Sequence, residues 1–186
     1  MRYPVGTSGQ TLVLTDSVLA HFDRHRQRKW LQSEAGGQLF ARIERAEIRV
    51  EEATGPRRTD RRTRMTYHAD RAEEQHEIDT RYPQGLHYVG DWHTHPTAHP
   101  EPSLRDLTTI SETVCRSSHS LNAFVLIIVG TDCASTSLCV LLHDGRNQLR
   151  LHPEHRLQKG ESRGADGHAL DANEGKYSPG AGNPAH

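Results

Sequence analysis

The chain has 186 residues, which fits one domain with a modest excess. Its 23 basic and 24 acidic residues balance, so charge gives no reason to expect a nucleic-acid partner or an anionic membrane. The longest apolar run, residues 123–129, is far shorter than the ~20 residues of a membrane-spanning helix. No apolar signal-peptide core is present near residue 1, and the three cysteines form no C-x-x-C pair. We therefore expect a cytoplasmic protein with free thiols.

Apolar periodicity predicts helices and strands interspersed along residues 1–152. The expected elements are a strand at 11–14, a helix over 16–29, two strands within 39–50, a weak helix over 69–80, a strand over 86–95, a helix over 103–116, and strands over 123–129, 138–143 and 148–152. The run at 123–129 is apolar throughout, which is typical of a strand buried on both faces. Gly36-Gly37 is expected to break the pattern before the second strand. The order of elements indicates a single α/β domain.

Two polar segments stand apart from this pattern. Residues 54–64 carry five arginines between Arg57 and Arg64, and we expect a solvated loop there; the alternative is a docking patch for an acidic partner. Residues 153–186 contain six of the fifteen glycines and few large apolar side chains. That composition predicts a disordered polar tail after a domain spanning residues 1–152.

The segment GDWHTHPTAHPEPSLRDL carries the clearest chemistry. His93 and His95 are two apart in a predicted strand, so both imidazoles point to one face while Trp92 and Thr94 point to the other. Asp106 lies in the first turn of the next predicted helix. Two imidazoles and one carboxylate form the ligand set of a catalytic zinc site that keeps a position open for water or substrate. We predict a metal site at His93, His95 and Asp106.

Ser103 lies three residues before Asp106, which has two explanations. The spacing is that of a capping box, in which the serine caps the helix and the acid bonds back to the cap. It also places a hydroxyl beside the predicted metal site. In a chain with 14 histidines a lone His-x-His is expected by chance, whereas adding Ser and Asp at fixed offsets is not. Both explanations hold together if the capping hydroxyl faces the site.

A hydrolytic metal site also needs a base that takes a proton from water, and a carboxylate is the usual choice. Glu34 precedes a small Ala-Gly-Gly segment that leads into a strand, where we expect backbone to approach a substrate closely. Glu44, Glu47 and Asp91 are competing candidates, and spacing alone does not choose among the four.

These motifs together resemble the JAMM (JAB/MPN) metalloproteases, the zinc isopeptidases that remove ubiquitin and its relatives. The resemblance runs from about residue 12 to 151 and rests on His93-Thr94-His95-Pro96 followed by Ser103 and Asp106, and on Glu34-Ala-Gly-Gly. It implies an MPN fold, cytidine-deaminase-like, with a mixed, mostly antiparallel sheet flanked by helices. It also implies zinc on His93, His95 and Asp106, with Glu34 as general acid and base and Ser103 holding the attacking water and stabilising the oxyanion.

The resemblance further implies a substrate class. Family members cut the bond between the C-terminus of a ubiquitin-like protein and its target, and bind that C-terminal tail as an added strand. The wording YVGDWHTHP is similar to bacterial members encoded beside E1- and E2-like conjugating enzymes, including the deconjugases of CBASS anti-phage operons that free a nucleotidyltransferase from its conjugated partner.

Two other functional classes remain open from the residues. The same fold occurs as a scaffold that binds a ubiquitin-like protein without cutting it, although such relatives typically lose metal ligands. The His-His-Asp set also matches the facial triad of non-haem iron enzymes.

Overall fold

The computed structural model describes residues 1–154, which contain ten strands, three α-helices and one 3-10 helix. The strands are β1 (Arg2–Pro4), β2 (Thr11–Leu14), β3 (Gly36–Ile43), β4 (Glu47–Ala53), β5 (Arg61–Arg62), β6 (Tyr67–His68), β7 (His87–Thr94), β8 (Phe124–Val129), β9 (Leu138–His143) and β10 (Gln148–Leu151). The helices are α1 (Asp16–His25), α2 (Arg71–Arg81), η1 (Tyr82–Gln84) and α3 (Leu104–Arg116). The predicted α/β class is confirmed.

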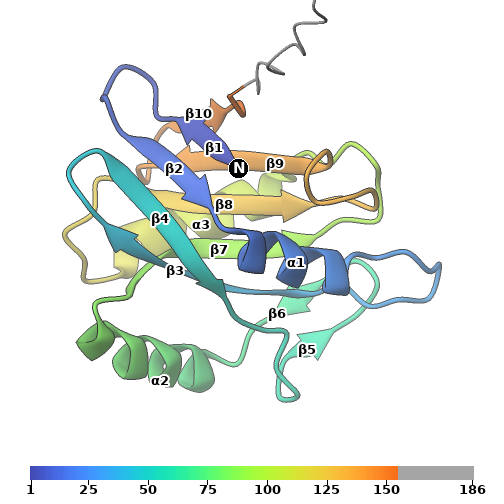
Figure 1. The fold of residues 1–186 in the computed structure, drawn as a ribbon. Helices are drawn as coiled ribbons and strands as arrows, with labels where there is room; N and C mark the ends of the chain where they lie inside the picture. The colour runs from blue at the N-terminus through green and yellow to red at the C-terminus, as the bar shows by residue number, and fades with distance from the viewer. Residues whose placement is uncertain (155–186) are drawn as a thin grey trace, which may run out of the picture. The chain divides into compact units, whose positions relative to one another are not determined.

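Eight of these strands form one sheet in the order β1-β2-β4-β3-β7-β8-β9-β10, and β5 pairs with β6 alone (Figure 1). The pairs β2–β4 and β7–β8 are parallel, and the other neighbours are antiparallel. The sheet is therefore mixed and mostly antiparallel, as predicted. β7 lies at its centre, between β3 and β8, so its backbone is hydrogen-bonded along both edges.

Helices cover both faces of the sheet, and each face has its own apolar cluster. On one face, Val18 and Phe22 of α1 pack with Trp92 and other buried side chains of the sheet. On the other, Ile110 and Val114 of α3 pack over β8 and β9. Successive residues of β8 alternate between the two clusters, and all six are buried. The prediction that this strand is buried on both faces is confirmed.

Several element boundaries differ from the sequence-based prediction, each for a local reason. Helix α1 ends at His25 rather than Lys29, because the chain turns at Arg26 so that the side chain of Gln27 is buried. Gly36 and Gly37 lie inside β3 rather than breaking the pattern. Strands β1, β5 and β6 have too few residues to show periodicity, and the sequence did not predict them.

The prediction of a solvated loop over residues 54–64 is wrong for Arg57. Its side chain is only 9% exposed, and it donates to Glu77 of α2 through Nε at 2.9 Å. Asp60 and Glu74 lie 3.8 and 3.9 Å from the same guanidinium. The cation is therefore used inside the molecule, where it fastens the loop to α2, and only the later arginines of the segment remain available at the surface.

The remaining expectations concern the chain ends and the thiols. All three cysteines are free, as predicted, with Cys115 and Cys133 exposed and Cys139 buried. Among the described residues no helix is both long enough and apolar enough to span a bilayer. The tail predicted over residues 153–186 lies outside the described residues except for its first two.

Candidate metal centre

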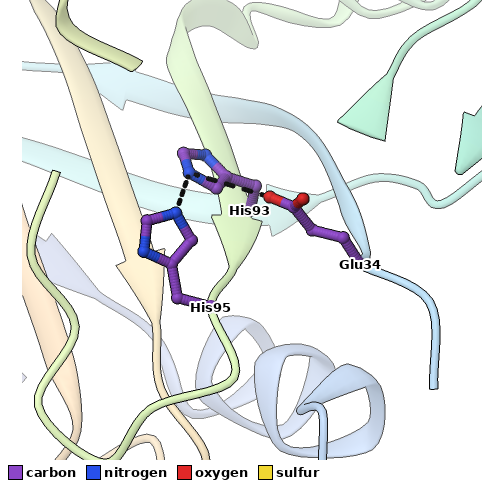
Figure 2. A group of neighbouring side chains, drawn as sticks. All are labelled: Glu34, His93 and His95. Carbon is purple, nitrogen blue, oxygen red and sulfur yellow. Dashed lines mark hydrogen bonds and ion pairs between the residues drawn. The ribbon is translucent and has the colours of Figure 1, made fainter. Parts of the chain in front are cut away.

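Strand β7 presents the two histidines of the predicted site on one face. Its hydrogen bonding to β8 continues past the last strand residue, because the amide of His95 donates to the carbonyl of Val129 at 2.9 Å. The period-2 alternation therefore holds for both histidines. Their Nε2 atoms lie 3.1 Å apart, and Figure 2 shows the two rings converging in front of the strand.

Helix α3 brings the third predicted ligand to the same place. Asp106 lies 3.3 Å from Nε2 of His93 through Oδ1 and 3.4 Å from Nε2 of His95 through Oδ2. Ser103 caps the helix in a complete capping box, and its backbone amide and hydroxyl both donate to Oδ2 of Asp106 at 2.7 Å. The capping explanation and the metal-site explanation of this motif thus hold together, since one carboxylate does both.

These separations can be tested against zinc chemistry. In a tetrahedral zinc site with ligand bonds of about 2.0–2.1 Å, two ligand atoms lie about 3.3 Å apart. The two Nε2 atoms lie 3.1 Å apart, close to that edge, and each imidazole contacts a different oxygen of Asp106, at 3.3 Å for His93 and 3.4 Å for His95. The side chains that converge here, two imidazoles and a carboxylate, are donors that fit a zinc ion.

Glu34 is the other carboxylate near these nitrogens. One of its oxygens lies with both imidazoles in a group of possible ligand atoms within 4.8 Å of one another, and this group contains Glu34 rather than Asp106. Glu34 is therefore the alternative third ligand. Its Oε1 is 4.0 Å from Nε2 of His93, however, which is longer than a tetrahedral edge. The shorter contacts of Asp106 with the two histidines therefore favour Asp106 as the third ligand. Glu34 lies farther from the histidine nitrogens, at a position that suits the predicted base.

Long-range pairing places Glu34 at the site. Gly36 pairs with His93 in the β3–β7 register, and the amide of Ala35 donates to the hydroxyl of Thr94 at 3.0 Å. The amide of Glu34 itself donates to the carbonyl of Thr63 at 2.7 Å. With the chain held on both sides, the carboxyl group is directed toward the histidines, as Figure 2 shows.

The double glycine lies where neighbouring segments pack closely against the backbone. A Cβ on Gly37 would collide with the carbonyl oxygen of Thr54, and one on Gly36 would lie 2.7 Å from the ring of Tyr67. Both positions are already in contact with protein. The glycines therefore let neighbouring segments pack closely beside Glu34. Gly37 also lines the cleft, and the close approach of a substrate to this backbone stays a prediction.

The electrostatics of the cluster separate its two carboxylates. Glu34 is only 6% exposed, and this burial raises the pKa of its carboxyl group. The nearby histidines oppose the rise only in part. Burial alone would raise the pKa of Asp106 too, but hydrogen bonds from His93 and His95 outweigh it and hold that pKa well below its usual range. A proton is thus easier to place on Glu34 than on Asp106.

The other candidate bases stand elsewhere. Glu47 pairs with Arg2 at 3.0 Å near the distant sheet edge, and Glu44 lies in the exposed β3–β4 turn. Asp91 does lie in the same cleft, since it precedes His93 by two residues on the same face of β7. Sequence reasoning noted its carboxylate but missed its surroundings: burial, followed by the charge of Glu74, raises the pKa of Asp91 to about 7. The hydroxyl of Tyr88 donates to it at 3.0 Å.

A cleft of about 600 Å³ opens over the candidate site. Its walls come from the start of α3 on one side and from β6 and α2 on the other, with β7 as its floor. Arg105 and His68 face each other across it at 3.0 Å. Glu34, His93, His95, Ser103 and Asp106 all line this cleft. The five predicted site residues are thus brought together in one cleft.

Such a fold and site define an α/β domain in which two histidines and a carboxylate, residues that could hold a metal ion, converge in a cleft. A family model described as prokaryotic homologues of the JAB domain matches residues 16–140. The chain belongs to this family.

Three curated relatives carry the name CD-NTase/cGAS isopeptidase. The protein of Enterobacter hormaechei subsp. hoffmannii is 37% identical over 59 residues, covering 32% of this chain and 33% of its own. That of Escherichia coli is 25% identical over 99 residues, covering 52% and 64%. That of Pseudomonas aeruginosa is 33% identical over 100 residues, covering 51% and 62%. Each match therefore spans less than two thirds of the relative's length.

A solved structure supports the fold independently. The solution structure of a protein from Desulfitobacterium hafniense superposes with a TM-score of 0.56 over 75% of this chain and 88% of that one. At 18% identity the likeness concerns the fold alone.

Proposed function

We propose that this protein is a zinc-dependent isopeptidase or peptidase that cuts the amide bond between the C-terminus of a conjugated protein and its target. The observation that carries the proposal is the convergence of His93, His95 and the carboxylate of Asp106 at 3.1–3.4 Å, with the buried Glu34 beside them. Membership in the JAB family and relatives named as isopeptidases support it.

Zinc held by the three ligands would polarise the scissile carbonyl and make the attacking water more acidic. Glu34 takes the proton of that water on a carboxylate oxygen and returns it to the nitrogen of the leaving amine. The raised pKa of Glu34 suits this exchange. A carboxyl group whose pKa is shifted toward that of the activated water can both accept the proton and release it.

Ser103 has a supporting role in this proposal. Its hydroxyl lines the cleft and donates to Oδ2 of Asp106, which fixes the orientation of that carboxylate toward the histidines. When a substrate binds, the same hydroxyl would turn its single proton from Asp106 to the developing oxyanion, the role that the family resemblance implies.

The substrate we propose follows from the relatives' name. A CD-NTase, a bacterial nucleotidyltransferase related to cGAS, joined through its C-terminus to another molecule, is the conjugate that fits an isopeptidase of this kind. The protein would then act as a deconjugase of a CBASS-type anti-phage system, alongside E1- and E2-like enzymes, and a ubiquitin-like conjugate is the broader alternative within the same chemistry.

A Glu34→Gln variant tests the proposal. It should retain stoichiometric zinc but lose about 10²–10⁴-fold in kcat on a conjugate whose scissile bond is an isopeptide, since general acid–base catalysis contributes about that much. Glu44→Gln, in the exposed β3–β4 turn, is the matched control and should cleave normally. Zinc-dependent cleavage that survives Glu34→Gln would remove Glu34 from its role. If a purified, zinc-loaded parent cleaves no amide, a binding scaffold takes the place of the enzyme.

The iron alternative has a separate test. A facial-triad oxygenase needs open positions for oxygen and a co-substrate, and it gives no role to a buried carboxylate beside the triad. Metal analysis of freshly purified protein should find zinc; iron with oxygen consumption would favour the oxygenase.

A further inference from the structure

Two surface loops beside the candidate site expose large apolar side chains. Trp30 is 73% exposed and Leu31 86% in the loop after α1, and Met65 is 68% exposed in the loop between β5 and β6. These are three of the seven large hydrophobics that residues 1–154 expose. We call Trp30, Leu31 and Met65 the apolar patch. Trp, Met and Arg are the residue types that protein interfaces favour, so such a gathering points to a partner.

The patch is held in place rather than formed by loose loops. The side chain of Gln27, only 3% exposed, donates to the carbonyl of Gln32 at 3.0 Å and to that of Arg64 at 2.9 Å. Its own carbonyl oxygen accepts from the hydroxyl of Thr94 on β7 at 3.1 Å. One buried amide thus ties both loops to each other and to the central strand. In Figure 1 the loop after α1 and the teal loop between β5 and β6 project together from the same side.

Cations outnumber acids around the patch, where Asp23 pairs with Arg26 at 3.0 Å. Residues 24–32 contain four Lys and Arg side chains and residues 61–66 contain three, and neither segment contains an acid. The guanidinium of Arg64 stacks on the ring of Trp30 at 3.6 Å. Within residues 1–154, Arg28, Lys29 and Arg61 form no ion pair with a carboxylate. A partner that complements this surface carries acidic groups around apolar ones.

The patch is continuous with the cleft of the proposed enzyme. The amide of Glu34 donates to the carbonyl of Thr63, so the second loop is fastened to the proposed base itself. Met65 and Thr66 line both the loop and the cleft. If the terminal segment of a conjugated protein lies in the cleft, the folded body attached to that segment therefore lies next to the patch.

We propose that the apolar patch and its surrounding cations dock the folded body of the conjugated protein, through an acidic surface with exposed apolar side chains close to the scissile bond. This inference rests on the proposed function, since it names how the same site would choose its substrate. A second copy of this chain is disfavoured as the occupant, because a two-fold contact would bring the same cations face to face. The patch would make recognition of a whole protein stronger than recognition of its terminal peptide.

The test compares two probes that share one scissile bond. The first is a full-length CD-NTase joined through its C-terminal carboxyl to the ε-amine of a fluorescent lysine peptide. The second is the last few residues of the same CD-NTase joined to the same lysine. A Trp30→Ser/Leu31→Ser variant should lose about tenfold or more in kcat/KM on the first probe, mainly through KM, because truncating central interface side chains weakens binding to that degree. It should cleave the second probe as the parent does.

Charge reversal tests the second half of the inference. Arg28→Glu/Lys29→Glu should slow cleavage of the full-length probe and flatten its dependence on salt, since those cations act through screened attraction. Tyr82→Ser, which alters an exposed aromatic at the end of α2, and Arg45→Glu, in the β3–β4 turn, are the matched controls and should leave both probes unaffected. Circular dichroism confirms that each variant is folded.

Binding separates this inference from the proposed function. Anisotropy of the full-length probe with a Glu34→Gln protein, which binds without cutting, should show weaker affinity when Trp30→Ser/Leu31→Ser is added. Equal affinity and equal kcat/KM with and without the patch would overturn the docking inference while cleavage of the short probe kept the proposed function. If the Glu34→Gln protein binds no full-length probe, the docking inference is also overturned. Self-association that disappears in the patch variant would assign the surface to a second copy instead.

Discussion

The two faces of β7 carry neighbouring residues with opposite uses. On the α1 face, Trp92 is 1% exposed and Thr94 fully buried, and every polar atom of the two side chains is hydrogen-bonded. On the α3 face, His93 and His95 meet a carboxylate in an open cleft, with their nitrogens directed at one another. The packed face fixes the strand so that the open face can hold charged groups close together. Removing residues from one face or the other should therefore give two different kinds of defect.

The largest effect should come from the open face. His95→Ala should lower kcat/KM by about 10³-fold or more and abolish stoichiometric zinc, because a lost metal removes several kcal/mol of transition-state stabilisation. Its unfolding should match that of the metal-free parent. His99→Ala, which removes an exposed histidine from the following loop, is the control. Metal analysis measures the zinc content of the two variants, and peptide cleavage measures their kcat/KM. A His95→Ala protein that keeps its zinc would contradict the ligand assignment.

On the packed face, Trp92→Ala should instead act through stability. Its ring lies against Phe22 at 5.1 Å and His21 at 5.2 Å, and its indole donates to the carbonyl of Thr54 at 2.9 Å. Large-to-small changes of this size cost about 3–5 kcal/mol. Trp30→Ala, at an exposed tryptophan, should change the free energy of unfolding by less than about 0.5 kcal/mol. Denaturant melts of the two variants give the comparison, and similar values would refute it.

Thr94→Val should lower both stability and activity, with a smaller effect on stability than Trp92→Ala. Valine keeps the shape but leaves the amide of Ala35 and the side-chain oxygen of Gln27 without the hydroxyl, at a cost of about 1–3 kcal/mol. Because Ala35 follows Glu34, activity should fall further than stability explains. Thr108→Val, on the exposed side of α3, is the control. The prediction fails if activity, measured well below the melting temperature, equals that of the parent.

The smallest effect concerns a histidine on the packed face. Burial, together with the charge of His25, lowers the pKa of His21 to about 4. The unfolded chain therefore takes up a proton at this residue at a higher pH than the folded one, so stability is complete above about pH 6.5 and declines as the pH falls toward 4. A His21→Gln variant should show a shallower decline over that window in urea titrations. An unchanged slope would show that His21 does not contribute to the pH dependence of stability in this window.

How much could be read from the sequence depended on how local each feature is. His93 with His95, and Ser103 with Asp106, are set by strand and helix-cap geometry within a few residues, so their grouping could be predicted. Glu34 reaches the site only through the pairing of β3 with β7, and spacing alone ranked it with three other acids. The burial of Arg57 depends on Glu77, twenty residues on and in a different element, and no local pattern reports such a contact.

The capping box of α3 has a consequence for the energetics of ion capture. Asp106 is already oriented by the amide and hydroxyl of Ser103, so the rotamer freedom that a flexible carboxylate would surrender on coordination has been given up during folding. In the proposed metal site, affinity for the cation would thereby be coupled to the integrity of one helical turn. Fraying of that turn would release the ion, and a bound ion would in return protect the turn from fraying.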